Sequence, residues 1–428
     1  NNNGSVYTIF YLPPAPNQDS AKGIPQRGWV DEATSLYYEA DVEHYPANPF
    51  FSPAGFQYKL RADEALVFIT KLPPVCKYYS FINYIMFTQE KAGKDYSLEK
   101  GYFRTGNEET GYYHPVFGSI GSSVNFQNVK AVGEGSFGGD AVIVISANKT
   151  VTDSVMAKLL EAGYSENMLN LMTIPEKTYR MGLEKGKDSF CLIGRISQPA
   201  DKEAYDTYIA NLSSASAVLR VTPKQPIPSN PYANEKLIPR GTGIHEVAGL
   251  DDVEQHLDKM RKAIIDKYKD AYDYEELTSD IAVPEGLTAY LKDTNAQGDN
   301  RDTAYLMTKD FSLNSDEDFI VVYGVNHTAT GKAHYSNAVL YARPMLNGLC
   351  SVYDSLFAGT AIAYLGEDCK DADSYYVYKM ARTAMDEHTK IIEYSTGNEK
   401  SLLLSTKIIS MCFTNFYKNY GKSYIISK

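Results

Sequence analysis

Hydrophobic positions along this chain gather in short runs that are rich in Val, Ile, Tyr and Thr. Many of these runs alternate between apolar and polar residues, which is the period of a strand with one buried face. The residue types that fill them are those that favour strands. Other runs, at 66–70, 190–196 and 319–323, are almost continuously apolar. The pattern predicts a protein built mainly from antiparallel strands.

Four segments are predicted to be helices instead. Segment 151–162 has apolar residues on one face and is followed by a glycine, and segment 251–269 sets one apolar stripe against dense charge. Two shorter segments, 202–212 and 374–388, also read as helices. Strands and helices together predict an α+β fold with two β-rich, sandwich-like, mainly antiparallel domains and helices packed on the sheets.

The expected domain boundary is a proline-rich segment near the middle of the chain. Segment 223–243 holds five prolines, which disfavour both helices and central strands, so we interpret it as a semi-rigid linker. A chain of 428 residues is also long for one hydrophobic core. The predicted organisation is therefore an N-terminal domain over 1–222, a linker over 223–243 and a C-terminal domain over 244–428.

The two halves of the chain share a weak internal similarity. Asp-Glu precedes an apolar strand near residue 66 and again near residue 319, and a Tyr-Ser pair opens the next strand at 79–80 and at 335–336. Further matches follow in the same order, so the halves suggest a duplicated β-rich unit. The alternative is that any two β-rich halves share this rhythm.

The segment 319–341 carries the most site-capable side chains in an otherwise apolar window. Its expected structure is a β-hairpin whose turn includes Thr330 and Gly331. With a two-residue turn, His327 would oppose His334 with Cβ atoms about 5 Å apart, a geometry that suits a divalent metal or a proton relay. With a bulged turn the two imidazoles would be split. The sequence leaves the register open, and two satisfied polar residues at a strand end remain the simpler interpretation. The candidate ligand-binding residues here are Asn326, His327, Lys332, His334 and Tyr335, of which His327 and His334 are also the candidate metal ligands.

A second group of candidate ligand-binding residues lies just upstream. Arg301 and Asp302 are adjacent and Tyr305 follows. The charged pair could position a ligand carboxylate or a sugar hydroxyl. The alternative is a turn in which Asp302 bonds nearby backbone amides.

The remaining motifs do not indicate a common enzyme class or cofactor. The glycines at 133–139 have the spacing of a dinucleotide fingerprint, but a strand rather than a helix follows, so a connection between strands is the better interpretation. The sequence has no nucleophile elbow, zinc-protease motif or phosphate-binding loop. Cys350 and Cys369 could form a disulfide or remain free, and Cys412 has the apolar surroundings of a core thiol. No cofactor is predicted beyond the divalent metal considered above.

The composition of the chain limits the kinds of partner that we expect it to bind. A net charge of −11 disfavours nucleic-acid binding, because phosphate neutralisation needs an excess of Lys and Arg. No apolar run reaches transmembrane length.

Tyrosine is abundant, with 35 Tyr against 17 Phe and one Trp. Tyrosines serve recognition faces as well as strands, and strand propensity is the simpler explanation. The polar leader 1–5 favours an exported protein, extracellular, periplasmic or lipid-anchored at the cell surface.

One resemblance adds to this reading. The run Asn-Arg-Asp-Thr-Ala-Tyr at 300–305, followed by an acidic turn, an apolar strand and a second Tyr-containing strand, resembles a pattern in uncharacterised exported bacterial proteins with paired β-rich domains of unknown function. The resemblance implies export and a two-domain β-rich build, and it assigns no catalytic residue.

The sequence thus predicts a binding protein for a small polar ligand or glycan. The alternatives are a metal-assisted hydrolase using His327 and His334, and a structural cell-envelope protein.

Overall fold

The structure is a computed structural model that describes residues 5–10, 12, 57–96, 105–108, 111–236, 247–281, 284–342, 347–392, 400–409 and 421–427. Contacts within the chain divide it into two units. The first unit comprises Tyr7–Ile238 and Val283–Arg301, and the second comprises Asn1–Val6, Pro239–Ala282 and Asp302–Lys428. The described part of the proline-rich segment, 223–236, lies in the first unit. Pro231 there forms an isolated β-bridge with Asn148.

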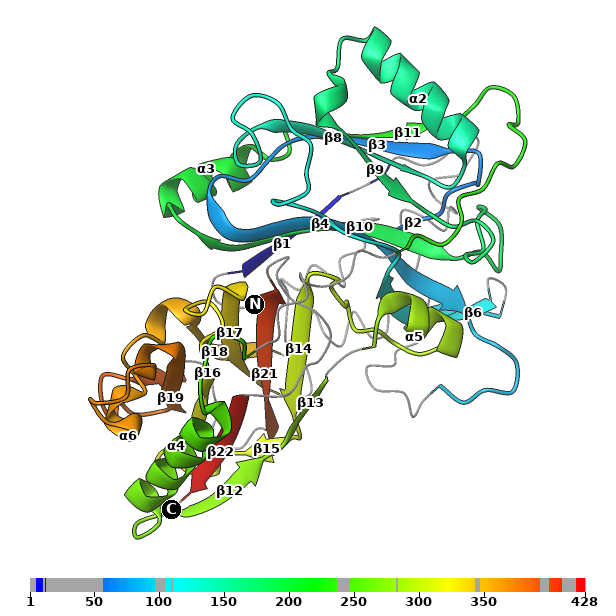
Figure 1. The fold of residues 1–428 in the computed structure, drawn as a ribbon. Helices are drawn as coiled ribbons and strands as arrows, with labels where there is room; N and C mark the ends of the chain where they lie inside the picture. The colour runs from blue at the N-terminus through cyan, green and yellow to red at the C-terminus, as the bar shows by residue number, and fades with distance from the viewer. Residues whose placement is uncertain are drawn as a thin grey trace. The chain divides into compact units, whose positions relative to one another are not determined.

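Two sheets form the framework of the first unit (Figure 1). The larger sheet has the order β1-β10-β4-β6-β5, with β2 beside β10 and β7 beside β4. The smaller has the order β11-β3-β8-β9, in which β9 runs parallel to β8 and the other pairs are antiparallel. The elements are β1 Ser5–Ile9, β2 Gln57–Tyr58, β3 Ala65–Lys71, β4 Cys76–Gln89, β5 Thr105–Asn107, β6 Gly111–Ser119, β7 Val124–Asn125, β8 Asp140–Ser146, α2 Lys149–Glu161, η2 Glu166–Met168, β9 Leu169–Thr173, β10 Ser189–Pro199, α3 Lys202–Asn211, β11 Ser216–Val221 and α5 Gly286–Lys292.

The two sheets enclose the main core of the first unit. Phe68 of β3 and Phe81 of β4 meet there with ring centroids 5.4 Å apart. Because side chains alternate along a strand, Ala65 and Val67 of β3 face the opposite side of the smaller sheet. They pack there against Val155 and other apolar residues of α2, so this helix covers the outer face of the smaller sheet.

Two further sheets form the second unit. One has the order β12-β22-β16-β19-β20, and the other has the order β13-β14-β21-β17-β18 with β15 beside β21. The pairing is antiparallel except for β19 with β20. The elements are α4 Val253–Tyr268, β12 Asp273–Leu277, β13 Ser279–Ile281, β14 Thr303–Thr308, β15 Phe311–Ser312, β16 Phe319–Val325, β17 Ala333–Ala342, β18 Asn347–Tyr353, η3 Asp354–Leu356, α6 Ile362–Leu365, η4 Ala372–Ser374, β19 Tyr375–Ala381, β20 Thr389–Ile391, β21 Lys400–Ile409 and β22 Gly421–Ser427.

The second unit repeats the layered packing. Ile320 and Val322 of β16 enter a core with Leu340 of β17, while Val321 on the opposite face packs under α4. The fold class is therefore α+β with mainly antiparallel, face-to-face sheets, and this confirms the predicted class. No helix among the described residues is both long and apolar enough to cross a bilayer.

The expected hairpin over 319–341 is wrong. β16 pairs with β19 and β22, whereas β17 pairs with β21 and β18. The two strands therefore lie in different sheets, and residues 326–332 form the corner between them. Both edges of each strand are already occupied by other strands, so β16 and β17 have no edge left for each other. In the first unit the short link 72–75 makes the same kind of corner between β3 and β4.

The strands that matched in sequence hold matching places in the two units. In the first unit β3 lies between β11 and β8, and in the second β16 lies between β22 and β19. β4 lies between β10 and β6, as β17 lies between β21 and β18. β9 and β20 are each the parallel neighbour at one edge, but β20 has three residues and β9 has five.

The helical predictions are mostly confirmed. α2, α3 and α4 lie where the sequence predicts helices, but 374–388 is not a helix. Its first part forms β19, where all seven residues are buried beside β16. This double-sided burial favours a strand over the exposed face that a surface helix needs.

Two further sequence interpretations are settled by the structure. The glycines at 133–139 connect strands, with Val132 and Asp140 bridged across the loop and Gly133, Gly135 and Gly138 at positive φ. None of the four cysteines in the described ranges is joined to another of them by a disulfide, so Cys350 and Cys369 do not pair. Cys412 lies outside these ranges.

Residues 284–300 attach closely to β6 in the first unit. The buried carboxylate of Asp299 accepts hydrogen bonds from Ser119 N (2.7 Å), Ser119 Oγ (2.7 Å) and Gly286 N (3.0 Å). Ala296 and Gly298 donate backbone hydrogen bonds to Val116 and Phe117. Burial raises the pKa of Asp299 above its ordinary value, although these three donors oppose the shift.

Candidate functional site

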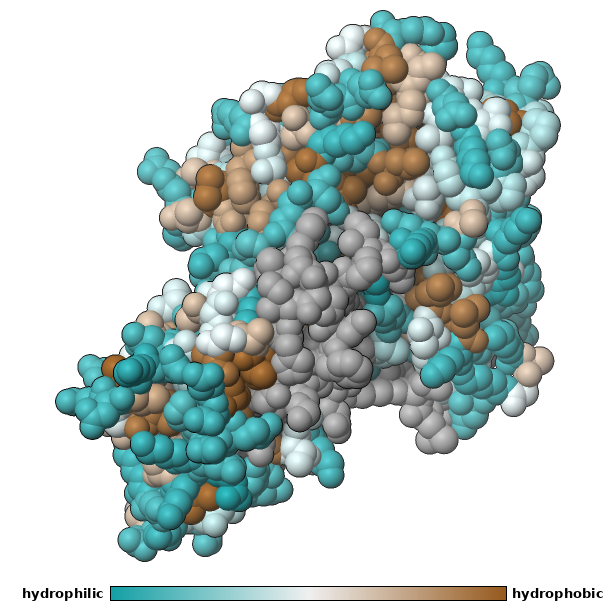
Figure 2. All heavy atoms as spheres, in the orientation of Figure 1, coloured by the Kyte–Doolittle hydropathy of each residue, from teal (hydrophilic) through white to brown (hydrophobic). Residues whose placement is uncertain are grey.

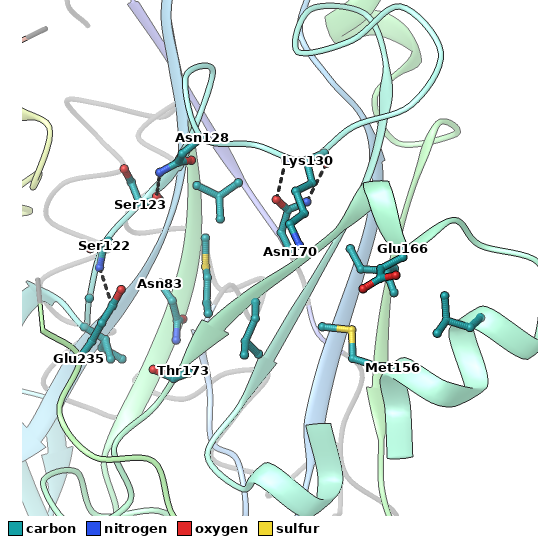
Figure 3. A pocket seen from close by; sticks show the side chains of 17 residues that line it. Asn83, Ser122, Ser123, Asn128, Lys130, Met156, Glu166, Asn170, Thr173 and Glu235 are labelled. Atoms are coloured by element: carbon teal, nitrogen blue, oxygen red, sulfur yellow. Dashed lines mark hydrogen bonds between the residues drawn. The ribbon is translucent and has the colours of Figure 1, made fainter. Parts of the chain in front are cut away.

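A cavity of about 590 Å³ opens in the first unit along the edge strand β9 (Figure 3). This volume lies within the range of small-ligand pockets, about 300–1,000 Å³. β9 contributes residues 169–173, α2 and η2 contribute one wall, and the loop 120–130 contributes the other. All of the lining residues belong to the first unit.

The backbone of β9 offers an unpaired edge to this cavity. Ile174 N donates to Ser146 O (2.9 Å), so alternate residues of β9 direct their backbone groups towards β8. Leu171 and Thr173 therefore direct their N–H and C=O groups away from β8. No described residue bonds to these groups. An unpaired strand edge is a template on which another extended chain can add hydrogen bonds.

Asn170 fixes one side of the groove. Its Oδ1 accepts from Lys130 N (2.8 Å), and its Nδ2 donates to Lys130 O (2.9 Å), Val142 O (3.1 Å) and Met168 O (3.1 Å). Figure 3 shows the two side-chain contacts that join Asn170 to Lys130. A single amide therefore holds the loop 120–130 beside β9, and the free edge continues beyond it at Leu171 and Thr173.

The other wall is apolar. Leu171 of β9 and Leu160 of α2 are 39% and 46% exposed, which is high for leucine side chains, and Met156 of α2 lies with them. Figure 2 shows apolar atoms gathered on this face beside α2. Exposed leucines that border a cavity are a common sign of a binding surface. An extended ligand with apolar side groups would remove them from water.

A buried amide lies deeper in the cavity lining. Asn83 is 5% exposed, and its Oδ1 accepts from the hydroxyl of Tyr58 at 2.5 Å. Burial raises the pKa of Tyr58 well above its ordinary value, so this hydroxyl stays protonated and remains a donor. Among the described residues nothing accepts from the Nδ2 group of Asn83. A buried donor without an acceptor is costly, and an acceptor on a bound ligand would remove that cost.

Charged groups of both signs border the cavity. Lys130 and Glu166 are exposed, and the carboxylate of Glu235 accepts from Ser122 N at 3.0 Å. One cation and two anions give no strong preference for a charged ligand. Among the described lining residues none is aromatic.

The candidates expected at 326–334 lie at the corner between the sheets of the second unit. Asn326 and His327 are 3% and 1% exposed, and His334 is exposed. His327 O accepts from Lys332 N (2.8 Å) and from Ala333 N (2.9 Å), and Asn326 Oδ1 accepts from Thr328 Oγ1 (2.6 Å). These bonds shape the corner. The paired imidazoles that motivated a metal site depended on a hairpin that does not form. No three His, Cys, Asp or Glu side chains in the described part group as metal ligands.

The remaining candidates are dispersed. Tyr335 is 1% exposed in β17, and its hydroxyl accepts from Asn337 Nδ2 at 2.6 Å. Arg301 lies in the first unit and forms an ion pair with Glu285, whereas Asp302 and Tyr305 lie in the second unit. Residues 301–302 form a turn, which the sequence offered as the alternative interpretation.

The sequence did not predict the groove, because the groove depends on strand pairing between residues that are far apart in the chain. Leu171 belongs to a short apolar run like many others, and the exposure of that leucine depends on which edge of β9 remains unpaired. Asn170, within an otherwise apolar strand, was the one unusual residue that could have drawn attention.

The sheets and the groove define an α+β protein with a candidate binding site on an edge strand. No protein-family model matches the sequence, and no curated protein matches it. Two solved structures resemble the chain at 11% identity. One is an uncharacterized protein from Burkholderia cenocepacia, with a TM-score of 0.40 over 92% of this chain and 87% of that one. The other is the VPA0106 protein from Vibrio parahaemolyticus, with a TM-score of 0.39 over 93% and 96%. Neither name states an activity.

Proposed function

We propose that this protein is a binding protein whose groove beside β9 takes an extended peptide segment as an added strand. The observation that carries the proposal is the unpaired backbone of Leu171 and Thr173 along the cavity. Strand addition of this kind gains affinity from main-chain hydrogen bonds and specificity from alternate side chains. The five residues of β9 span about 17 Å, at roughly 3.3 Å per residue.

The lining favours a peptide over the glycan considered from the sequence. Sugar rings stack on aromatic faces, and none of the described lining residues is aromatic. Leu160, Leu171 and Met156 suit aliphatic side chains instead. The buried donor of Asn83 suits a carbonyl oxygen, which a peptide supplies at every residue.

The direct test uses a defined peptide. The hexapeptide acetyl-Val-Thr-Val-Thr-Val-Thr-amide, labelled with a fluorophore, is titrated with the protein and its anisotropy recorded. Leu171→Pro removes the outward N–H of residue 171 and leaves the bonds between β9 and β8 in place. We expect this substitution to weaken binding at least about tenfold, the effect of losing about 1.4 kcal/mol.

Two further variants separate the backbone from the side chain. Leu171→Ala keeps the N–H and is expected to weaken binding less than Leu171→Pro. Leu219→Ala removes a similarly exposed leucine from β11, the opposite edge of the sheet, and should leave binding unchanged. Circular dichroism confirms that each variant is folded. Equal binding by the wild type and Leu171→Pro would refute strand addition at β9, and no measurable binding up to about 1 mM would refute a site for this class of peptide.

The matching strand orders support a second part of the proposal, that the two units arose by internal duplication. β9 and β20 then descend from one strand, and the longer β9 is the copy that carries the groove. Export of the protein, expected from the sequence, remains part of the proposal. Peptide segments presented outside the cytoplasm would then be the ligands.

A further inference from the structure

A thiol, an imidazole and a phenol meet on the helix-covered side of the second unit. Cys369 Sγ lies 3.7 Å from His256 Nε2, and His256 Nδ1 lies 3.1 Å from the hydroxyl of Tyr375. His256 is in the first turns of α4, Cys369 is in the loop between α6 and η4, and Tyr375 opens β19. Three separate elements thus converge on one chain of polar contacts.

The contacts of His256 suit a base for the thiol in one of its two tautomers. Burial raises the pKa of Tyr375 above its ordinary value, so its hydroxyl stays protonated and can either donate to Nδ1 or accept from it. In the tautomer that carries the proton on Nδ1, that N–H donates to the hydroxyl oxygen, and Nε2 faces the thiol with its lone pair. A nucleophile, a base and a group that orients the base form the usual arrangement of an activated nucleophile.

We propose that Cys369 and His256 form a reactive thiol site that undergoes thiol–disulfide exchange with small disulfides. The proton of Cys369 moves to Nε2 of His256, and the thiolate attacks one sulfur of the disulfide R–S–S–R. A bond forms between Sγ and that sulfur as the original S–S bond breaks. The leaving thiolate takes up a proton from the imidazolium. Cys369 is oxidised to a mixed disulfide and the released thiol is the reduced product.

Cys369 is more exposed to solvent than the other cysteines among the described residues. Cys76, Cys191 and Cys350 are 7%, 0% and 2% exposed, whereas Cys369 is half-buried. Burial raises the pKa of Cys191 above its ordinary value and that of Cys76 to about 12, so both stay as thiols at neutral pH. Reactive cysteines combine partial exposure with a neighbouring base, and Cys369 has both.

The charged groups around the site are mixed in sign. Asp252 precedes α4, and Asp371 follows Cys369 in its loop, and both act electrostatically on Tyr375. Lys259, one turn along α4 from His256, donates to Leu365 O.

The test measures the rate at which the full-length protein reacts with 5,5′-dithiobis(2-nitrobenzoate), followed by release of the coloured aromatic thiolate. Peptide mapping by mass spectrometry identifies the cysteine that is modified. Cys369→Ser should abolish the fast phase. His256→Asn should slow that phase at least about tenfold at pH 7, and the difference should disappear near pH 10, where hydroxide ionises thiols directly.

Matched variants separate activation from structural damage. His388→Asn changes a half-buried histidine elsewhere in the second unit and should leave the fast phase unchanged. Tyr375→Phe keeps the ring but loses the hydroxyl that orients His256, so we expect an intermediate rate. The proposal is overturned if Cys369 reacts no faster than free cysteine at pH 7. It is also overturned if His256→Asn slows the reaction equally at every pH, which would indicate a change in access alone.

Discussion

At the scale of single residues, Asn170 links the fold to the groove. It lies 7% exposed in the edge strand and uses both ends of its amide. Three carbonyl oxygens around Nδ2 and one N–H at Oδ1 fix the orientation of the amide without ambiguity. At this position of β9, the side-chain amide binds the backbone of Lys130, where a further strand would otherwise pair. The backbone edge of β9 remains unpaired at Leu171.

Asn170→Asp tests this role with almost no change in shape. The substitution sets a carboxylate oxygen against three carbonyl oxygens, so we expect a loss of about 3 kcal/mol in the free energy of unfolding. The comparison is Asn167→Asp on the exposed η2 turn, which should change stability by less than about 0.5 kcal/mol. Urea denaturation measures both. Equal effects of the two substitutions would show that the Asn170 amide does not hold the loop.

At the scale of elements, the placement of α5 depends on two glycines. A Cβ on Gly286 would lie 2.2 Å from Ser119 N, and a Cβ on Gly118 would lie 2.7 Å from Gly286 Cα. The helix therefore begins in direct backbone contact with β6, where Asp299 holds Gly286 N and Ser119 N together. Close backbone approach of this kind is a main structural use of glycine.

Gly286→Ala should therefore destabilise the first unit. Overpacking in a site that cannot relax costs about 1–3 kcal/mol, and here the clash is with backbone atoms. Leu291→Ala on the same helix removes a side chain that is 66% exposed and should cost less than about 0.5 kcal/mol. Thermal unfolding followed by circular dichroism compares the two variants. If Gly286→Ala unfolds at the wild-type temperature, α5 does not contact β6 as described.

The elements that sequence predicts well are those whose pattern is local. α2 and α4 each show a helical period, and α2 and α3 have N-cap residues, Asn148 and Asp201. The errors at 319–341 and 374–388 arise where distant partners decide the structure. Whether β16 pairs with β17 or with β19 and β22 depends on residues that lie 50 or more positions away along the chain. The sequence likewise has no local signal that 283–301 joins the first unit.

At the scale of the whole molecule, the tyrosines fill the interior. Tyr58, Tyr79, Tyr323, Tyr335 and Tyr375 are among its largest fully buried side chains. Many tyrosines of the described residues therefore pack in the core, most of them within strands, as the simpler interpretation from the sequence expects. The groove beside β9 has no tyrosine among its described lining residues. The abundance of tyrosine in the sequence therefore gave no indication of this site.

Buried tyrosines also determine how the protein responds to alkali. Burial raises the pKa of Tyr79, Tyr179, Tyr268 and Tyr376 above the ordinary value of 10.0. The folded state then holds protons that the unfolded state releases, so stability is complete below pH 10 and falls as the pH rises above it. Each such tyrosine costs about 1.4 kcal/mol by pH 11. Four of them together cost about 5.6 kcal/mol by pH 11, which reaches the lower end of the stability of a typical domain, about 5–15 kcal/mol.

We therefore expect tyrosinate absorbance to appear together with loss of the far-ultraviolet circular dichroism signal, in one steep step near pH 11. Tyr376→Phe removes one buried phenol that is stacked on Phe357 at 3.9 Å, while the ring can stay in place. The midpoint of alkaline unfolding should move to higher pH in this variant, because one fewer proton is released on unfolding. A broad titration of tyrosines around pH 10 with the circular dichroism unchanged would contradict this account, since the phenols would then ionise inside the folded protein.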